Sequence, residues 1–490
     1  MKIKLYRYAF ISALCAMAAS CSGFLDETDK DRFIPSTVDH YAALMLQEFN
    51  SESAVFAETQ YMTDDVMEAP QLGSGLYSRP YVKPMYTWQK DIDMLETGSR
   101  TTNDRAWVSF YRQIAIMNYV IEEIDRAEGT QAERDYVKGE AYFNRAFCYF
   151  CLTNLYAEPY RDAQQARTTY GVPLRTDIGI NPSYNKNMLD ENYSRIEDDL
   201  TEARRLIEGS NITKSQYHPT TKACDLLISR VKLYKKEYSD AIGAATRVIE
   251  GASLQKLTSV SAGTPFITAS NPEVIYSFSQ MSGSLFQGAM AQAGMVVSDG
   301  LVDLFTAGDL RTALFFTTST STSGITSTYP RKAEAGYTST GKANFRIAEA
   351  YLNRAEAYAY SDQTDKARED MQTLLSNRYR STSDFSVPTG REELISFIEQ
   401  ERRKELCFET QHRWFDLRRM DETRRPIIEH RFSVLNSANK VSRIETYTLL
   451  ANDRNYTLSL PQAEKNNNPL IRDYERYDKF PEINDIVIIE

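Results

Sequence analysis

Histidine and cysteine are scarce in this chain, with four and six residues respectively among 490. None of the histidines has a second histidine or a cysteine at the spacing that transition-metal ligands show; they are His40, His218, His412 and His430. The sequence also lacks a glycine-rich phosphate loop and a hydrolase nucleophile elbow. We therefore expect no cofactor, no transition-metal site and no catalytic activity.

Positive charge is also in short supply. Lysine and arginine together number 57 against 67 acidic residues, which gives a formal net charge of −10. An acidic body repels the phosphates of DNA and RNA, so a nucleic-acid partner is not expected.

The chain starts with a short apolar run behind three basic residues, Lys2, Lys4 and Arg7. The run from Tyr8 to Met17 is too short for a membrane-spanning helix, which needs roughly 20 apolar residues. Small residues at 18–20 then precede Cys21. This order is typical of a removable export signal over residues 1–20.

A cysteine at that junction favours a bacterial lipoprotein. In such proteins the sulfur of the first mature residue carries a diacylglycerol and its amine a further acyl chain, commonly palmitate. Each buried CH₂ contributes about 0.8 kcal/mol, so several chains make a lasting anchor. We predict that Cys21 is lipidated and that residues 21–32 form an acidic linker to a single domain over 33–490. An ordinary signal peptide with a chance cysteine is the alternative.

The cysteines that remain are Cys148, Cys151, Cys224 and Cys407. The first two have redox-motif spacing, but they lie in an aromatic helical run with no βαβ pattern around it. We expect buried thiols that pack as small hydrophobic groups, and no disulfide framework.

Hydrophobic periodicity predicts a mostly α-helical protein. The expected helices span 104–126, 132–155, 195–207, 222–235, 239–250, 343–360, 364–377 and 392–420. A short strand over 456–460 is expected to pair with residues 447–450.

Two segments look like copies of one helix pair. Small residues at Ser229 and Ala241 in the first copy match Ala355 and Ala367 in the second. Small residues there let two antiparallel helices approach closely, as in tetratricopeptide repeats. An irregular helical bundle is the alternative.

Aromatic residues are abundant, with 31 tyrosines and 22 phenylalanines, and many fall in two long segments expected to be irregular, 60–100 and 251–342. Loops of this length in a compact domain are usually functional or disordered. The Ser/Thr-rich run 317–328 is a possible disordered loop tip.

Residues 401–420 read ERRKELCFETQHRWFDLRRM and resemble the signature pattern of the SusD/RagB family of outer-membrane nutrient-binding lipoproteins. Three further segments match that family in order: the start CSGFLD at 21–26, FRIAEAYLNRAEA at 345–357, and LPQAE with NP over 460–469. The resemblance therefore spans the chain from the lipid site almost to the last residue.

The resemblance implies a tetratricopeptide-like helical frame with long irregular loops and a few short strands. It also implies binding of a glycan, or sometimes a peptide-derived nutrient, at the cell surface. Bound ligand would pass to a TonB-dependent transporter of the SusC type, on which the lipoprotein sits like a lid.

The residues of 401–420 themselves indicate a structural helix. Basic and acidic residues alternate at spacings that allow ion pairs, Trp414 is expected in the core, and Lys404 is expected at the surface. A lipid-anchored glycoside hydrolase that uses Glu405 and Glu409 is one alternative, but neighbours on one helix face cannot flank a sugar. A tetratricopeptide adaptor that binds only protein is the other.

Sugars present apolar C–H faces ringed by hydroxyls, so their binding sites combine aromatic side chains with polar ones. Residues 77–88 hold four aromatics, one arginine and two prolines. Proline-stiffened loops hold aromatic faces with little loss of entropy on binding. The candidate ligand-binding residues are Tyr77, Arg79, Tyr81, Trp88, Phe286, Gln287, Tyr329 and Arg331.

Overall fold

The computed structural model describes residues 34–51, 58–101, 105–179, 184–268, 271–278, 290–332 and 343–485. Within these ranges most of the regular structure is helical and the strands are short, as predicted. The expected signal 1–20, Cys21 and the rest of the linker lie outside the described residues. Among the described helices, none combines the length and the apolar character that crossing a bilayer requires.

The described helices are of two kinds, long helices of 12 residues or more and short helices of eight residues or fewer. The long ones are α2 Val38–Ser51, α4 Arg105–Glu123, α5 Gln131–Tyr156, α7 Leu189–Ser210, α8 Thr221–Tyr234, α9 Tyr238–Ile249, α13 Ile347–Tyr360, α14 Thr364–Ser376 and α15 Arg391–Leu406. The short ones are α3 Arg79–Tyr86, α6 Ala163–Ala166, α11 Asp299–Val302, α12 Arg311–Phe315, α16 His412–Arg419 and α17 Gln462–Asn467.

The strands form four small antiparallel sheets. Their pairs are β1 Val66–Glu68 with β3 Met295–Val297, β2 Val274–Phe278 with β6 Ala343–Arg346, β4 Phe316–Thr320 with β5 Thr326–Pro330, and β7 Ile428–Leu435 with β8 Val441–Leu449 and β9 Glu482–Asp485.

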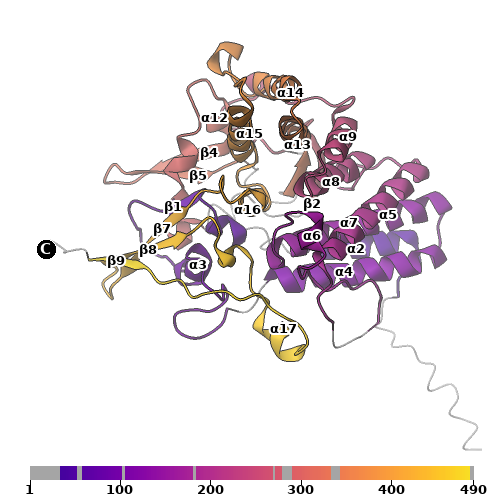
Figure 1. Ribbon diagram of the computed structural model, residues 1–490, viewed down its shortest axis with the longest axis horizontal. Coiled ribbons are helices and arrows are strands. Elements are labelled where there is room, and N and C mark those ends of the chain that lie inside the picture. Colours follow the sequence, from indigo (N-terminus) through magenta and orange to yellow (C-terminus); the bar gives the residue numbers. More distant parts are fainter. Residues whose placement is uncertain are drawn as a thin grey trace, which may run out of the picture.

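The long helices pack in chain order, each against the next, from α4 through α5, α7, α8, α9 and α13 to α14. In Figure 1 this series runs along the right and over the top, whereas α3 and the strands β1, β4, β5, β7, β8 and β9 lie to the left; β2 lies beside α8. The helical frame and the loop region are thus two sides of one molecule.

The two predicted repeat copies have the same turn. Lys236, between α8 and α9, and Asp362, between α13 and α14, both have left-handed backbone conformations, with φ of 61° and 57°. Ser229 and Ala355 occupy the matching helix positions, and both are fully buried. The prediction of repeated helix pairs is confirmed.

Helix α5 is buried on nearly every side. It begins with a capping box, in which Thr130 and Glu133 each satisfy a backbone N–H of the other. Cys148 and Cys151 lie in its core-facing surface as free thiols, and burial raises the pKa of Cys148 well above its usual value. Packing as small hydrophobic groups is what the sequence predicted for them.

The predicted helix 392–420 is wrong in one respect, because it is two helices. Helix α15 ends at Leu406 and α16 starts at His412. Between them, Phe408 and Thr410 have left-handed backbone conformations, with φ of 57° and 44°. Non-glycine residues rarely adopt this conformation. Residues 407–411 contain no glycine or proline, so the sequence does not mark the break.

Several expectations about the loops and strands are also corrected. Residues 343–346 form β6 rather than the start of a helix, because they pair with β2. The run 317–328 is the β4–β5 hairpin and not a disordered tip. No strand forms over 456–460; strand β8, which contains residues 447–449, pairs with β7 and β9 instead.

A buried ion-pair cluster joins the loop region to the helices. Its members are Asp309, Arg311, Glu273, Lys332, Arg346, Arg378, Glu401, Lys404, Glu405 and Glu409. Lys404 was expected at the surface, but it is 2% exposed and pairs with Glu401 and Asp309, both at 2.8 Å. Trp414 is 1% exposed, which confirms its predicted place in the core.

Candidate functional site

Two tyrosines protrude where the chain enters α3. Tyr77 is 77% exposed and Tyr81, one helical turn later, is 53% exposed. Gly75, with φ of 75°, lies beneath Tyr77, since a Cβ added there would sit 3.4 Å from the tyrosine ring. We call Tyr77 and Tyr81 the α3 platform.

The α3 platform is partly helical, whereas the sequence predicted a loop stiffened by proline. Pro80 lies in the first turn of the helix, where a missing N–H costs nothing because that group has no partner inside the helix. Pro84 lies farther along α3, where the helix is nearly finished.

Arg79 and Trp88 point inward and do not join the platform. The Arg79 guanidinium pairs with Glu68 and lies 3.8 Å above the ring of Phe432. Trp88 is fully buried, stacks on His430 at 4.2 Å, and donates its indole N–H to the Met62 carbonyl at 2.8 Å.

A ligand on the surface cannot reach either side chain. Their internal contacts instead fix α3 against the rest of the molecule, and thereby hold Tyr77 and Tyr81 in place. Arg79 and Trp88 were among the ligand-binding candidates because of the composition of 77–88. Their partners Phe432 and His430 are more than 300 residues away, so the local sequence gives no sign of these contacts.

The second group of candidates lies on and beside the β4–β5 hairpin. Tyr329 is half-buried and pairs with Thr317 across the hairpin. Arg331 follows β5 and donates to the carbonyl of Ala313 at 2.6 Å. Phe286 and Gln287 lie outside the described residues.

The two predicted loop regions meet in space. The Ser323 hydroxyl, at the hairpin tip, donates to the Gln71 side chain at 2.5 Å. The Ser78 hydroxyl, just before α3, donates to Gln292 at 3.3 Å. Strands β1 and β3, which belong one to each region, also pair with each other. The two predicted loop regions are therefore in contact both at the hairpin tip and just before α3.

Sequence reasoning missed two exposed aromatic residues near the end of the chain, Tyr477, which is 52% exposed, and Phe480. Phe480, in the segment before β9, is 85% exposed. Residues 474–481 contain three aromatics and a proline in eight positions, the same compositional signal that was used for 77–88. That signal could have identified both residues.

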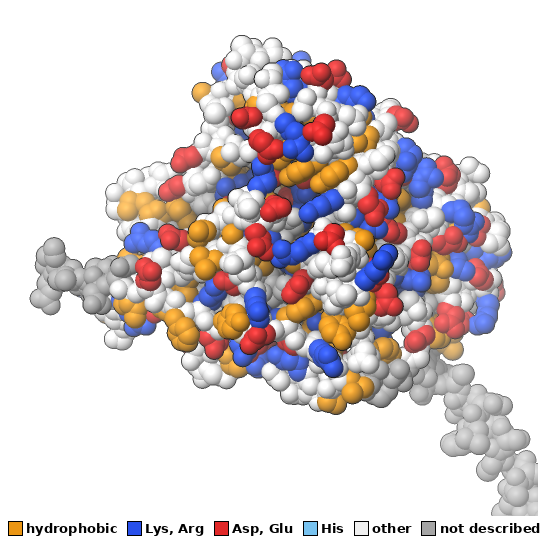
Figure 2. Space-filling view, in the orientation of Figure 1, with side chains coloured by type: hydrophobic (Ala, Val, Ile, Leu, Met, Phe, Trp, Pro, Cys, Tyr) orange, Lys and Arg blue, Asp and Glu red, His pale blue; other side chains and the backbone are white. Residues whose placement is uncertain are grey.

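The charges on the face that Figure 2 shows are mixed. Acidic and basic side chains alternate over the helices without a large area of one sign, and hydrophobic side chains appear among them. Among the described residues, no group of three or more acidic, histidine or cysteine side chains is arranged to hold a metal ion.

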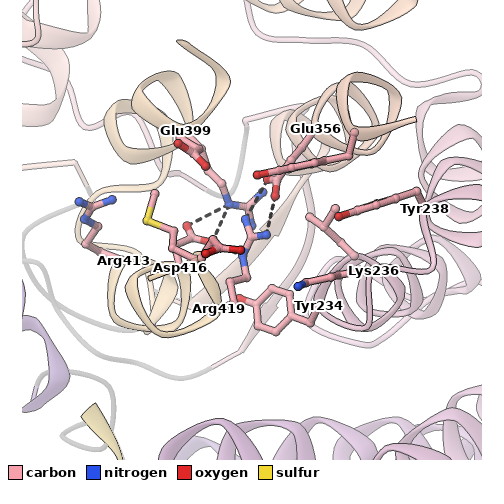
Figure 3. Close-up of a pocket in the computed structure, with 13 residues that line it drawn as sticks. Tyr234, Lys236, Tyr238, Glu356, Glu399, Arg413, Asp416 and Arg419 are labelled. Carbon is pink, nitrogen blue, oxygen red and sulfur yellow. Dashed lines mark hydrogen bonds and ion pairs between the residues drawn. The ribbon is translucent and has the colours of Figure 1, made fainter. Parts of the chain in front are cut away.

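A small cavity of about 80 Å³ lies between the repeat turn at Lys236 and helix α16. In Figure 3 the Arg419 side chain reaches between Asp416 and Glu356, and it pairs with Asp416 at 2.8 Å. Two polar groups on its lining, Tyr234 Oη and Arg402 Nη2, have no partner among the described residues. A water needs roughly 10–15 Å³ of such volume and polar partners, so this cavity suits a few waters rather than a sugar.

The acids of the hydrolase alternative are inaccessible. Glu405 is fully buried and Glu409 is 1% exposed. Burial alone would raise the pKa of Glu405, but Arg378 and Arg346 hold it well below its usual value. Arg346 and Lys332 likewise lower the pKa of Glu409, so both carboxylates are committed to buried ion pairs and a substrate cannot reach them.

Two segments of the chain match models of known protein families. Residues 23–233 match a family model described as starch-binding associating with outer membrane, and residues 309–477 match the SusD family model. No curated protein matches the chain.

Solved structures share the fold. A SusD superfamily protein from Bacteroides thetaiotaomicron has a TM-score of 0.70 at 20% identity, with 90% of this chain and 100% of that chain covered. A SusD-like carbohydrate binding protein from Bacteroides vulgatus has a TM-score of 0.65 at 20% identity, covering 89% and 97%. A SusD superfamily protein from Bacteroides fragilis has a TM-score of 0.65 at 20% identity, covering 89% and 99%.

The two family matches lie on the helical frame and on the segment that holds all of the buried ion-pair cluster except Glu273, and the shared fold extends over about 90% of the chain. This chain belongs to the SusD/RagB family.

Proposed function

We propose that this protein is a cell-surface lipoprotein that binds a glycan and delivers it to a SusC-type TonB-dependent transporter in the outer membrane. The observation that carries the proposal is the α3 platform. Tyr77, just before α3, and Tyr81, on α3, are exposed aromatic side chains, and the helix is fixed from beneath by Arg79 and Trp88. Rigid aromatic faces bind the apolar faces of sugars with little loss of entropy.

The matched family models support a location at the outer membrane, since one describes starch-binding proteins that associate with it. The carbohydrate-binding protein from Bacteroides vulgatus that shares this fold supports a glycan as the ligand. Lipidation of Cys21 would anchor the mature chain, with residues 21–32 as a linker and 33–490 as the folded domain.

Binding without chemical change is part of the proposal. The acids that the hydrolase alternative requires, Glu405 and Glu409, are buried and paired. Under the adaptor alternative, a protein surface would cover Tyr77 and Tyr81, and no glycan would bind there.

A glycan array probed with the soluble fragment 22–490 tests the proposal. We expect binding to one class of glycan, and recovery of that glycan intact after long incubation. Shortened products would support the hydrolase alternative, and an array without any bound glycan would contradict glycan binding.

A further inference from the structure

Residues 477–481 form a strap along the surface that two side-chain amides hold in an extended shape. Asn455 donates to the carbonyl of Tyr477 at 2.7 Å and accepts its N–H at 3.2 Å. Gln89 donates to the carbonyl of Lys479 at 3.2 Å and accepts its N–H at 3.3 Å. Each amide thus satisfies both backbone groups of one residue, as a neighbouring strand would.

The two held residues alternate with Asp478 and Phe480. In an extended segment alternate side chains share one side, so the strap presents Asp478 and Phe480 together. Both line a cavity of about 330 Å³, whose lining also includes Lys479 of the strap and Lys83 and Pro84 of α3. Phe480 is 85% exposed although the backbone on both sides of it is fixed. An apolar ring held open to water beside a cavity is suited to stacking on a ligand.

The charges around this cavity favour hydroxyl groups over anions. Lys83 is paired with Glu445 at 2.8 Å and also with Glu96, and Lys479 is paired with Asp453. Among the described residues, Asp478 has no ion-pair partner and can accept hydrogen bonds from a ligand. An added carboxylate or sulfate would meet acidic groups and no uncommitted lysine.

The cavity adjoins the α3 platform. Pro84 lies three residues beyond Tyr81 on α3, and residues three apart are neighbours on a helix surface. A chain of several sugar units could therefore contact the platform and the strap at the same time.

We infer that Phe480 and Asp478 form a second sugar-binding subsite, selective for an uncharged sugar unit of the glycan. Phe480 stacks on the C–H face of the sugar, and the Asp478 carboxylate accepts its hydroxyl hydrogens. This inference rests on the proposed function, because it extends the same ligand along α3.

The test measures binding of the mature chain, in detergent, to two neutral probes, maltoheptaose and xylohexaose, and to an anionic one, oligogalacturonate. We expect the wild type to bind a neutral probe, and Phe480→Ala to weaken that binding about five- to tenfold. Phe480→Tyr should keep most of the affinity, and Asp478→Asn should lose part of it. Leu470→Ala, which removes an apolar side chain that is 57% exposed but lies outside the cavity lining, is the matched control.

The outcomes separate the inference from the proposed function. Wild-type affinity in Phe480→Ala overturns the subsite and leaves the proposed function standing. Preference of the wild type for oligogalacturonate overturns the selectivity for uncharged sugars. Failure of the wild type to bind any glycan, on the array as well, overturns both. Unchanged thermal unfolding of Phe480→Ala shows that an affinity loss comes from the missing ring.

Discussion

Arg402 on α15 donates its Nε–H to both carboxylate oxygens of Asp416 on α16, at 3.0 and 2.9 Å. In one continuous helix these residues would be separated by about 21 Å along the axis, at 1.5 Å per residue. They meet because the chain breaks between the two helices. The side chains are 1% and 7% exposed, so the pair is shielded from water.

We predict that Arg402→Ala lowers the free energy of unfolding by about 3–5 kcal/mol, because it leaves a buried carboxylate without its main partner. Arg391→Ala is the control. Arg391 starts the same helix and pairs with Asp362 and Glu392, but its side chain is 40% exposed, so its loss should cost at most about 1 kcal/mol. Chemical denaturation measures both. Equal effects of the two changes would mean that α15 and α16 are not joined in this way.

The second prediction concerns pH. Burial lowers the pKa of His412 to about 4, despite the nearby Glu349 carboxylate. The unfolded chain takes up this proton near pH 6.5, whereas the folded chain resists until about pH 4, so stability falls as the pH falls between these values. One pKa unit corresponds to about 1.4 kcal/mol, and the loss attributable to His412 is about 3 kcal/mol.

His412→Gln should therefore make the free energy of unfolding fall less steeply between pH 6.5 and pH 4. Urea denaturation at a series of pH values measures this slope. The absolute stability of the variant is not the readout, because glutamine packs differently. A slope identical to that of the wild type would show that His412 does not resist protonation in the folded protein.

The third prediction concerns the anchor. Cys21→Ala should release the protein into the soluble periplasmic fraction, because the acyl chains are the strongest membrane-binding element that the sequence offers. Fractionation and immunoblotting should be done in cells lacking the transporter, so that docking cannot retain the variant. Persistent membrane association under those conditions would contradict lipidation at Cys21.

The sequence predicted most long helices to within a few residues, because their apolar periodicity agrees with their packing. It did not predict the break after Leu406, because Phe408 and Thr410 adopt left-handed conformations that only tertiary contacts enforce. The β4–β5 hairpin had a local signal in its β-branched threonines, but the Ser/Thr-rich composition concealed it.

The sequence predicted exposed aromatic side chains in 77–88 but did not predict which residues are exposed. Tyr77 and Tyr81 are exposed whereas Tyr86 and Trp88 are buried, because composition cannot tell which side chains point outward. Arg79 is buried because it forms an ion pair with Glu68 and lies over the ring of Phe432. The sequence of 77–88 predicts neither contact. The contact of Ser323 with Gln71 likewise depends on segments about 250 residues apart.

The measurement that tests glycan binding at the α3 platform most directly is calorimetric titration of the fragment 22–490 with the glycan that the array identifies, for the wild type and for Tyr81→Ala. We expect saturable binding that Tyr81→Ala weakens by at least about 1–2 kcal/mol, because removing one aromatic platform removes a large share of the contact. The melting temperature should stay almost unchanged, since the Tyr81 side chain is 53% exposed. Unaltered affinity in Tyr81→Ala, with the melting temperature also unaltered, would contradict a binding site at the α3 platform.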